Sequence, residues 1–141
     1  MKILLINGPN LGRLGQRQPD IYGTTTLREV VELAQKHAES RGATVIDFQS
    51  NHEGALIDRL EAMDFDAVVF NPGAYGHTSL ALRDTIEGIA KPTVEVHISD
   101  VHGREPFRHV LVLEDVVVAQ VVGRGINGYV EAIDILLDGQ Q

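Results

Sequence analysis

Polar side chains of the kinds that carry acid–base chemistry follow four short apolar segments of the chain. The polar stretches run over residues 7–10, 49–53, 71–77 and 95–99, and they contain Asn, His, Glu and Ser. His and Glu serve as general acids and bases, and Asn and Ser hydrogen-bond polar substrates. Any one such residue could instead form a turn or cap a helix. Because four stretches share this composition, we predict that they form an active site.

A long loop follows the first polar stretch and is a candidate lid. It covers residues 10–24, has no clear periodicity, and carries Gly12, Gly15 and Gly23 among two arginines and a tyrosine. Long irregular loops in compact domains are usually functional, and glycines permit hinge motion. The alternative is an ordinary surface loop with solvated arginines. We predict a lid that closes over the active site.

Five apolar runs must position these side chains, and each has the length of a buried β-strand. Runs rich in Val, Ile and Leu are typical of parallel strands that helices cover on both faces. The predicted strands are Lys2–Asn7, Ala43–Gln49, Ala67–Asn71, Thr93–His97 and Val116–Val122.

Helical patterns alternate with these strands. Thr26 and Glu29 have the spacing of a capping box, and Gly42 suits the end of the helix that they begin. The other predicted helices are Glu53–Asp64, Ser79–Ala90 and Gly128–Asp138. The alternation predicts an α/β fold, a single-domain, doubly wound sheet of five parallel strands with right-handed crossovers. Such sheets bind ligands beyond the C-terminal ends of the strands, where the polar stretches lie.

Composition argues against several classes of protein. The 141 residues carry 12 basic and 20 acidic side chains, and the net charge of −8 argues against a nucleic-acid binder. Cysteine is absent and the six histidines form no clustered ligand pattern, so we expect neither disulfides nor a metal site. The apolar run over residues 1–6 is too short for a signal sequence or a membrane span. We therefore expect a cytoplasmic protein without membrane contact.

One glycine motif resembles a cofactor fingerprint. Gly123, Gly125 and Gly128 have the GxGxxG spacing of dinucleotide-binding loops. That fingerprint also requires a further strand and an acidic residue about 20 positions later, which the sequence to residue 141 does not offer. A tight turn with close helix packing is the better interpretation, and we expect no cofactor.

Motifs spread over nearly the whole chain together form a specific pattern. They are 7–11, 14–15, Arg17, Pro19, 22–23, 49–54, 71–75, 77–79, 81–84, Pro92, 95–97, Ser99, 104–105, 107–108, Gly123, Gly125 and 128–129. In this order they resemble the type II 3-dehydroquinate dehydratases. The resemblance implies a flavodoxin-like fold and the dehydration of 3-dehydroquinate to 3-dehydroshikimate, a step of the shikimate pathway and of quinate breakdown. It also implies catalysis without a cofactor, and a homo-oligomer in which trimers assemble into a dodecamer.

The resemblance implies roles for three residues of the loop. Tyr22 is the implied base that removes the proton next to the ketone, and Arg17 is the charge that favours its phenolate. A free phenol has a pKa of about 10, so roughly one in a thousand is ionised at pH 7 without such help. Asn10 is implied to hold a water against the enolate oxygen, which stabilises the developing oxyanion.

The resemblance also implies an acid and its supporting residue near the end of the fourth strand. His97 protonates the departing hydroxyl, and Glu95 orients it. Strand side chains repeat every two residues, so the pair shares one face of the sheet. The alternative is a hydrogen-bonded His–Glu pair with a purely structural role.

The remaining implied residues bind the substrate. They are Asn71, His77, Ile98, Ser99 and Arg108. Arg108 holds ring hydroxyls, and the others hold the carboxylate, with backbone amides contributed by Ile98 and Ser99. Asp84 is implied to reach the site of a neighbouring subunit, so that oligomerisation completes the active site. The alternative for Asp84 is a solvated carboxylate on a helix.

Five residues depart from the family pattern. Gln18 stands where a glutamate is usual beside the lid arginine, and Asp100 replaces an asparagine near the expected anion site. Val110, Leu111 and Glu114 replace a stretch that usually carries a histidine and two serines. We expect Gln18 to alter the control of the arginine and Asp100 to weaken anion binding. The other three concern packing or assembly.

Two further functions remain open on the sequence. One is a flavodoxin-like module that binds phosphate or a flavin, which would purify coloured if it held flavin. The other is a catalytically silent oligomeric relative. The type I route through a lysine Schiff base is disfavoured, because its barrel needs roughly 200 residues or more. The chain's lysines are Lys2, Lys36 and Lys91.

Overall fold

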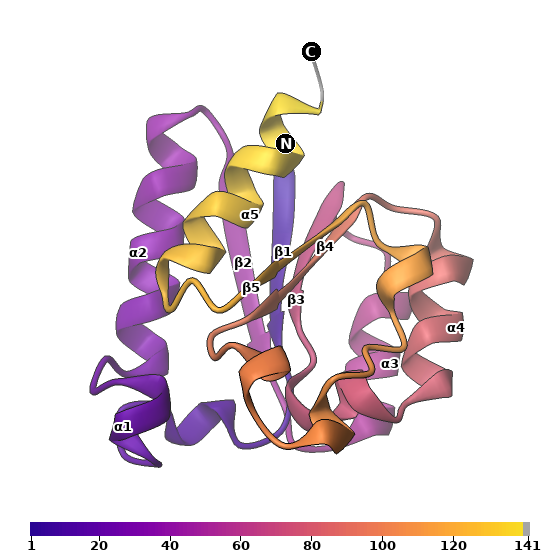
Figure 1. Ribbon diagram of the computed structural model, residues 1–141. Helices are drawn as coiled ribbons and strands as arrows, with labels where there is room; N and C mark the ends of the chain where they lie inside the picture. The colour runs from indigo at the N-terminus through magenta and orange to yellow at the C-terminus, as the bar shows by residue number, and fades with distance from the viewer. Residues whose placement is uncertain (140–141) are drawn as a thin grey trace.

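A five-stranded, all-parallel β-sheet runs through the middle of the molecule (Figure 1). The structure is a computed structural model that describes residues 1–139. The strands lie in the order β2-β1-β3-β4-β5, which is the flavodoxin-like order. Their bounds are β1 Lys2–Asn7, β2 Thr44–Gln49, β3 Ala67–Asn71, β4 Thr93–His97 and β5 Ala119–Val122. The predicted fold class is confirmed.

Helices cover both faces of the sheet (Figure 1). On one face lie α2 (Leu27–Ser40) and α5 (Asn127–Asp138), and on the other lie α3 (Glu53–Glu61) and α4 (Leu80–Ile89). Shorter helical turns occupy the connections: α1 Pro19–Tyr22, η1 Leu11–Arg13, η2 Gly73–His77, η3 Val101–Gly103, η4 Pro106–Arg108 and η5 Glu114–Val116.

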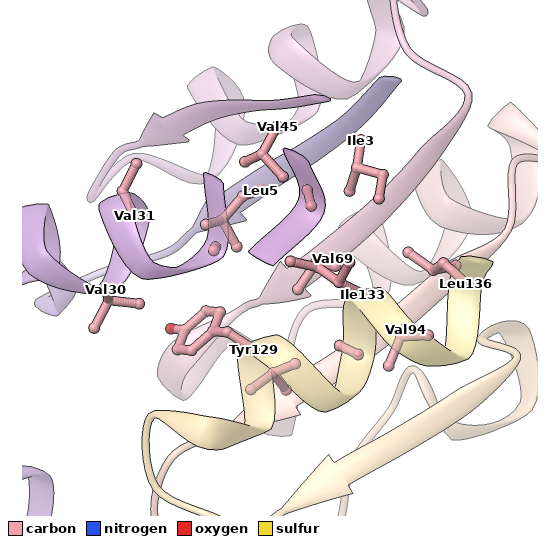
Figure 2. Close-up of a cluster of buried hydrophobic side chains, with 14 of the residues drawn as sticks. Ile3, Leu5, Val30, Val31, Val45, Val69, Val94, Tyr129, Ile133 and Leu136 are labelled. Atoms are coloured by element: carbon pink, nitrogen blue, oxygen red, sulfur yellow. The ribbon is translucent and has the colours of Figure 1, made fainter. Parts of the chain in front are cut away.

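Two hydrophobic cores flank the sheet because successive strand side chains point to opposite faces. On β1, Ile3 and Leu5 join the core under α2 and α5, and Leu4 and Ile6 join the core under α3 and α4. Figure 2 shows the first core, with the Tyr129 ring of α5 among aliphatic side chains. Burial on both faces explains why the strands read as continuous apolar runs.

The capping box is present at the start of α2. The Thr26 side chain accepts a hydrogen bond from the Glu29 backbone amide, and the Glu29 side chain accepts one from the Thr26 amide. Gly42 has a φ of 78°, a left-handed conformation that favours glycine just beyond a helix. The predicted beginning and end of this helix are confirmed.

The predicted start of the fifth strand is wrong. The strand begins at Ala119 instead of Val116, because residues 114–116 form the turn η5. The Val116 amide donates to the Leu113 carbonyl within that turn and is therefore not available to a sheet ladder. The valines of this segment serve packing instead of strand pairing, because Val116 and Val117 pack against the core under α3 and α4.

The loop over residues 10–24 also differs from its prediction as an irregular segment. It contains the short helical turns η1 and α1, which are too brief to show a period in the sequence. Leu11 and Leu14 are buried in the core and anchor the first half of the loop. The second half, with Arg17 and Tyr22, is half-buried or exposed.

Candidate active site

The C-terminal ends of β1, β3 and β4 open onto a cavity of about 130 Å³. Nine of the residues predicted for the site line it: Asn10, Arg17, Tyr22, Asn71, His77, His97, Ile98, Ser99 and Arg108. The structure therefore brings these side chains together at the edge of the sheet where doubly wound folds bind ligands. Two predicted residues, Glu95 and Asp84, lie elsewhere.

Glu95 lies behind His97 as its hydrogen-bond partner. The His97 Nε2 and Glu95 Oε2 atoms are 2.7 Å apart, and the side chains are 5% and 0% exposed. An ionised carboxylate only accepts hydrogen bonds, so His97 Nε2 carries the hydrogen in this pair. The pair therefore has the geometry of an oriented acid–base group whose imidazole faces the cavity.

Two guanidinium groups surround the Tyr22 ring. Arg17 stacks on the ring, with its Cζ atom 4.7 Å from the ring centre. Arg104 donates from Nη1 to the Tyr22 hydroxyl over 2.7 Å and also lies 3.5 Å from the Ser99 Oγ. The contact with the hydroxyl comes from Arg104, which is absent from the residues that the sequence predicts for the site. Its presence in the matching motif at residues 104–105 is the signal that could have found it.

A buried network orients the amide of Asn71. Asn71 Nδ2 donates to the Tyr129 hydroxyl over 2.9 Å, which in turn donates to Asn7 Oδ1 over 2.7 Å. The Gly73 amide donates to Asn71 Oδ1 over 3.0 Å. Asn71 therefore presents its remaining N–H toward the cavity. Burial raises the pKa of Tyr129 and keeps its phenol neutral, so that it can both donate and accept.

His77 is held by a backbone carbonyl. Its Nδ1 lies 2.9 Å from the Val110 carbonyl oxygen, which can only accept, so Nδ1 carries the hydrogen. Burial lowers the pKa of His77 below the ordinary value of 6.5, with the Val110 hydrogen bond opposing that effect. The neutral ring then presents Nε2 as an acceptor.

The cavity is locally basic although the chain is acidic overall. Arg17, Arg104 and Arg108 all line it. Arg108 also pairs with Glu105, whose carboxylate lies 3.1 Å from Nε. A cluster of guanidinium groups attracts and binds carboxylates and phosphates. The arrangement suits a small anionic ligand.

Asn10 reaches the cavity through a left-handed backbone conformation with φ of 69°. The backbone amide of Asn10 donates to Asn51 Oδ1 over 3.0 Å. This hydrogen bond connects the start of the loop to the segment that follows β2. Asn51 belongs to a polar stretch that the sequence singled out, but its supporting contact with Asn10 was not predicted.

Asp84 does not reach the cavity within one protomer. It lies exposed on α4, in a surface hollow shared with Glu61 and Met63 of the α3 end. The predicted role of this residue requires a second subunit and stays a prediction.

The departures from the family pattern have local explanations. Asp100 caps η3 by accepting from the His102 amide over 3.2 Å, and it is not among the described residues that line the cavity. The Val110 contact with His77 comes from backbone, Leu111 is buried and Glu114 is exposed. Gln18 precedes α1 with a φ of 40° and makes no side-chain cap.

The glycine motif forms a turn and a packing contact. Gly123 and Gly125 have φ values of 74° and 60°, and a Cβ atom at Gly128 would lie 3.3 Å from Val96. The turn-and-packing interpretation is confirmed. Among residues 1–139, no group of three or more His, Asp or Glu side chains is placed to hold a metal ion. No helix in the described range is long and apolar enough to cross a membrane.

Known proteins resemble this chain over nearly its whole length. The family model for class II dehydroquinases matches residues 1–137. The chain is 52% identical over 134 residues to catabolic 3-dehydroquinase 1 of Neosartorya fischeri, covering 94% of this chain and 89% of that protein. It is 50% identical over 140 residues to the 3-dehydroquinate dehydratase of Anoxybacillus flavithermus, covering 98% and 95%.

A solved structure gives the same result. The type II dehydroquinase of Butyrivibrio crossotus has a TM-score of 0.94 at 47% identity, covering 97% of each chain. The family match includes every residue that lines the cavity. The chain therefore belongs to the class II dehydroquinases, a family of hydro-lyase enzymes.

Proposed function

We propose that this chain is a type II 3-dehydroquinate dehydratase, which eliminates water from 3-dehydroquinate to give 3-dehydroshikimate through an enolate. The observation that carries the proposal is a tyrosine between two guanidinium groups in the same cavity as a buried His–Glu pair. Elimination from a β-hydroxy ketone needs a base, a group that stabilises the enolate oxygen, and an acid for the departing hydroxyl. The cavity contains a candidate for each.

Tyr22 is the proposed base. An N–H of Arg104 points at its oxygen and Arg17 covers its ring, so both guanidinium groups lie where they stabilise negative charge on that oxygen during proton transfer. The phenolate removes the proton next to the ketone, and the electron pair moves onto the ketone oxygen. Asn10 is proposed to hold a water against that oxygen and stabilise the enolate.

His97 is the proposed acid. As the imidazolium, it delivers the proton of Nδ1 to the hydroxyl while the carbon–oxygen bond breaks, and its Nε2–H stays on Glu95, which fixes the orientation of the ring. The step returns the electron pair from the enolate and forms the conjugated double bond of the product. Among the described residues that line the cavity there is no lysine, so the scheme uses none.

Substrate binding uses the remaining residues of the cavity. Asn71, Ser99 and the amides of Ile98 and Ser99 are proposed to hold the carboxylate, and Arg108 the ring hydroxyls. The sequence predicts His77 as a ligand of the carboxylate. In the structure its Nδ1 donates to Val110, so the neutral ring offers Nε2 as an acceptor for a substrate hydroxyl. The segment over residues 10–24 is proposed to close as a lid.

A homo-oligomer, with trimers assembled into a dodecamer, is part of the proposal. Asp84 lies outside the cavity of its own protomer, and the exposed side chains of Leu80, Phe107 and Val110 are large and apolar. Exposed apolar side chains of this size are often covered by a partner. Asp84 is proposed to complete the site of a neighbouring subunit. A cytoplasmic location stays a prediction.

The test is a direct assay. Formation of the conjugated enone is followed by ultraviolet absorbance with no added metal or cofactor, for the wild type and for Tyr22→Phe. We expect turnover by the wild type and a loss of at least about a thousandfold in the variant, because phenylalanine cannot accept the proton. Absence of turnover by a folded wild type would refute the proposal. Near-normal turnover by Tyr22→Phe would refute the base assignment alone.

Borohydride provides a second arm of the test. Reduction traps a Schiff base between substrate and lysine and would inactivate a type I enzyme. We expect full activity after treatment with substrate and borohydride. Inactivation, with a mass increase on Lys2, Lys36 or Lys91, would contradict the enolate route.

A further inference from the structure

The Glu95 carboxylate has a second hydrogen-bond partner on the neighbouring strand. Gln120 lies directly beside Glu95 in the parallel register of β4 and β5. Its Nε2 atom donates to Glu95 Oε1 over 2.8 Å, while His97 Nε2 contacts the other carboxylate oxygen over 2.7 Å. Within residues 1–139, these two groups supply the hydrogen bonds to this carboxylate.

Burial makes the Gln120 contact costly to lose. Glu95 is 0% exposed, and a buried carboxylate is strongly destabilised unless its oxygens are hydrogen-bonded. No Lys or Arg of the described chain forms an ion pair with it. A Cβ atom at Gly76 would lie 3.3 Å from Glu95 Oε2 and 3.2 Å from His97 Cε1, so backbone closes the other side of the pair. The Gln120 amide supplies the hydrogen bond to the oxygen on the opposite side of the carboxylate.

The chemistry of the carboxylate also fixes the orientation of the amide. An ionised carboxylate only accepts, so Gln120 must present its NH₂ group to Glu95. A donor to an anion stabilises the ionised state and reduces its basicity. With one oxygen held by Gln120, the other is aimed at His97, and the imidazole is kept in one tautomer.

We propose that Gln120 is a positioning residue for the acid of the reaction, acting on His97 through Glu95. The inference rests on the proposed function for its catalytic meaning, because His97 is the acid of that reaction. Gln120 itself is not among the residues that line the cavity, so it acts without touching substrate. Nothing in the sequence pattern singled it out.

The surroundings of the pair contain few other groups that could account for a pH effect. His77 lies on η2 with its ring centre 6.0 Å from that of His97, and Arg108 on η4 acts on His77 electrostatically. The β3 residue in register with Glu95 is Phe70, which is apolar. A change confined to Gln120 therefore reports on the Glu95–His97 pair.

The first experiment compares Gln120→Leu with the matched control Gln35→Leu. Gln35 is also half-buried, but it lies on α2 with its amide 3.5 Å from the Val45 carbonyl, away from the cavity. We expect Gln120→Leu to lower kcat roughly tenfold with little change in KM, the effect of losing one hydrogen bond to a charged group. The alkaline limb of its kcat profile moves to higher pH, because the pair without the amide holds its proton more tightly and is a weaker acid.

A second variant separates positioning from simple loss of packing. In Gln120→Glu the new carboxyl can donate to Glu95 only while it is protonated. Its activity relative to the wild type should therefore fall as pH rises. A ratio that is constant with pH would overturn the inference, as would a Gln120→Leu profile and rate equal to those of Gln35→Leu.

Nuclear magnetic resonance of ¹⁵N-labelled histidine gives a readout that does not depend on turnover. We expect the His97 titration to move to higher pH in Gln120→Leu and to stay unchanged in Gln35→Leu. An unchanged His97 titration in both variants would overturn the inference even if kcat fell. If the wild type lacked turnover but the titration moved, the hydrogen-bond network would stand and the proposed function would fail.

Discussion

At the scale of single residues, Arg104 and Arg17 contact the proposed base Tyr22 in different ways. Arg104 has an N–H on the phenol oxygen, whereas Arg17 stacks on the ring. The two arginines therefore contribute differently, although both are permanently charged. The first supplies a directed hydrogen bond, and the second supplies charge and covers the ring.

Substitution by lysine tests this difference. Lysine keeps the charge of either arginine but loses the planar fork and its directed N–H. We expect kcat to fall in both variants, and Arg104→Lys to lose at least about tenfold, since a charge-assisted hydrogen bond is lost. Steady-state kinetics of the two variants, with Arg28→Lys on the outer surface of α2 as control, checks this. Normal kcat in Arg104→Lys would contradict the role drawn from the 2.7 Å contact.

His77 makes a pH-dependent contribution to stability that can be predicted in sign. Its pKa in the folded protein lies below 6.5 because burial penalises the charged ring. Below that ordinary value the unfolded chain binds more protons than the folded chain, so the free energy of unfolding decreases as pH falls. Urea unfolding at pH 7.5 and 5.5 checks this. Between these two pH values the free energy of unfolding should decrease less in His77→Asn than in the wild type. An equal loss in both proteins would contradict the assignment.

At the scale of elements, α5 contributes to the site although none of its residues lines the cavity. Tyr129 lies in the first turn of α5. Its hydroxyl accepts a hydrogen bond from the side chain of Asn71 at the end of β3 and so orients that side chain. Tyr129→Phe removes the acceptor, so Asn71 no longer has a fixed N–H for the ligand. We expect KM to rise about tenfold with a smaller change in kcat, which is the signature of a binding group. An unchanged KM in a stable variant would show that Asn71 needs no such support.

The α1 segment carries local strain that substitution can release. Gln18 has a φ of 40°, which costs a side-chain-bearing residue about 1–2 kcal/mol, and glycine adopts it freely. Glycine also loses more conformational entropy on folding, which offsets part of this gain. Gln18→Gly should therefore raise the free energy of unfolding by roughly 0.5 kcal/mol. Gln16→Gly, in the same exposed segment without a positive φ, should lower it by a similar amount. Chemical denaturation checks both, and equal effects would contradict the strain.

At the scale of the whole molecule, the proposed role of Asp84 makes activity depend on assembly. Because Asp84 lies exposed and outside the cavity of its own protomer, its proposed contact with substrate would be made in the site of a neighbouring subunit. We expect Asp84→Asn to lose activity, and hybrid oligomers refolded from Asp84→Asn and Tyr22→Phe chains to regain part of it. Regain requires that each chain supply what the other lacks. Mixtures no more active than the separate variants, or full activity of Asp84→Asn alone, would contradict the shared site.

Most of the architecture could be predicted because it depends on short-range patterns. The strand runs, the Thr26–Glu29 capping box and the left-handed Gly42 each follow from residues that are neighbours in the sequence. The edge of the sheet that holds the cavity then follows from the general geometry of doubly wound sheets. The start of β5 and the turns η1 and α1 could not be read, since three- and four-residue turns show no period.

The supporting contacts of the site have a different origin. Arg104 lies 82 positions from Tyr22, Tyr129 lies 58 from Asn71, and Gln120 lies 25 from Glu95. Residue type and the family resemblance mark Tyr22, Asn71 and His97 as groups able to do chemistry. Which side chains hold them depends on strand register and loop packing, because hydrogen bonds require approach within about 3 Å. Distances of that kind arise only when the chain has folded.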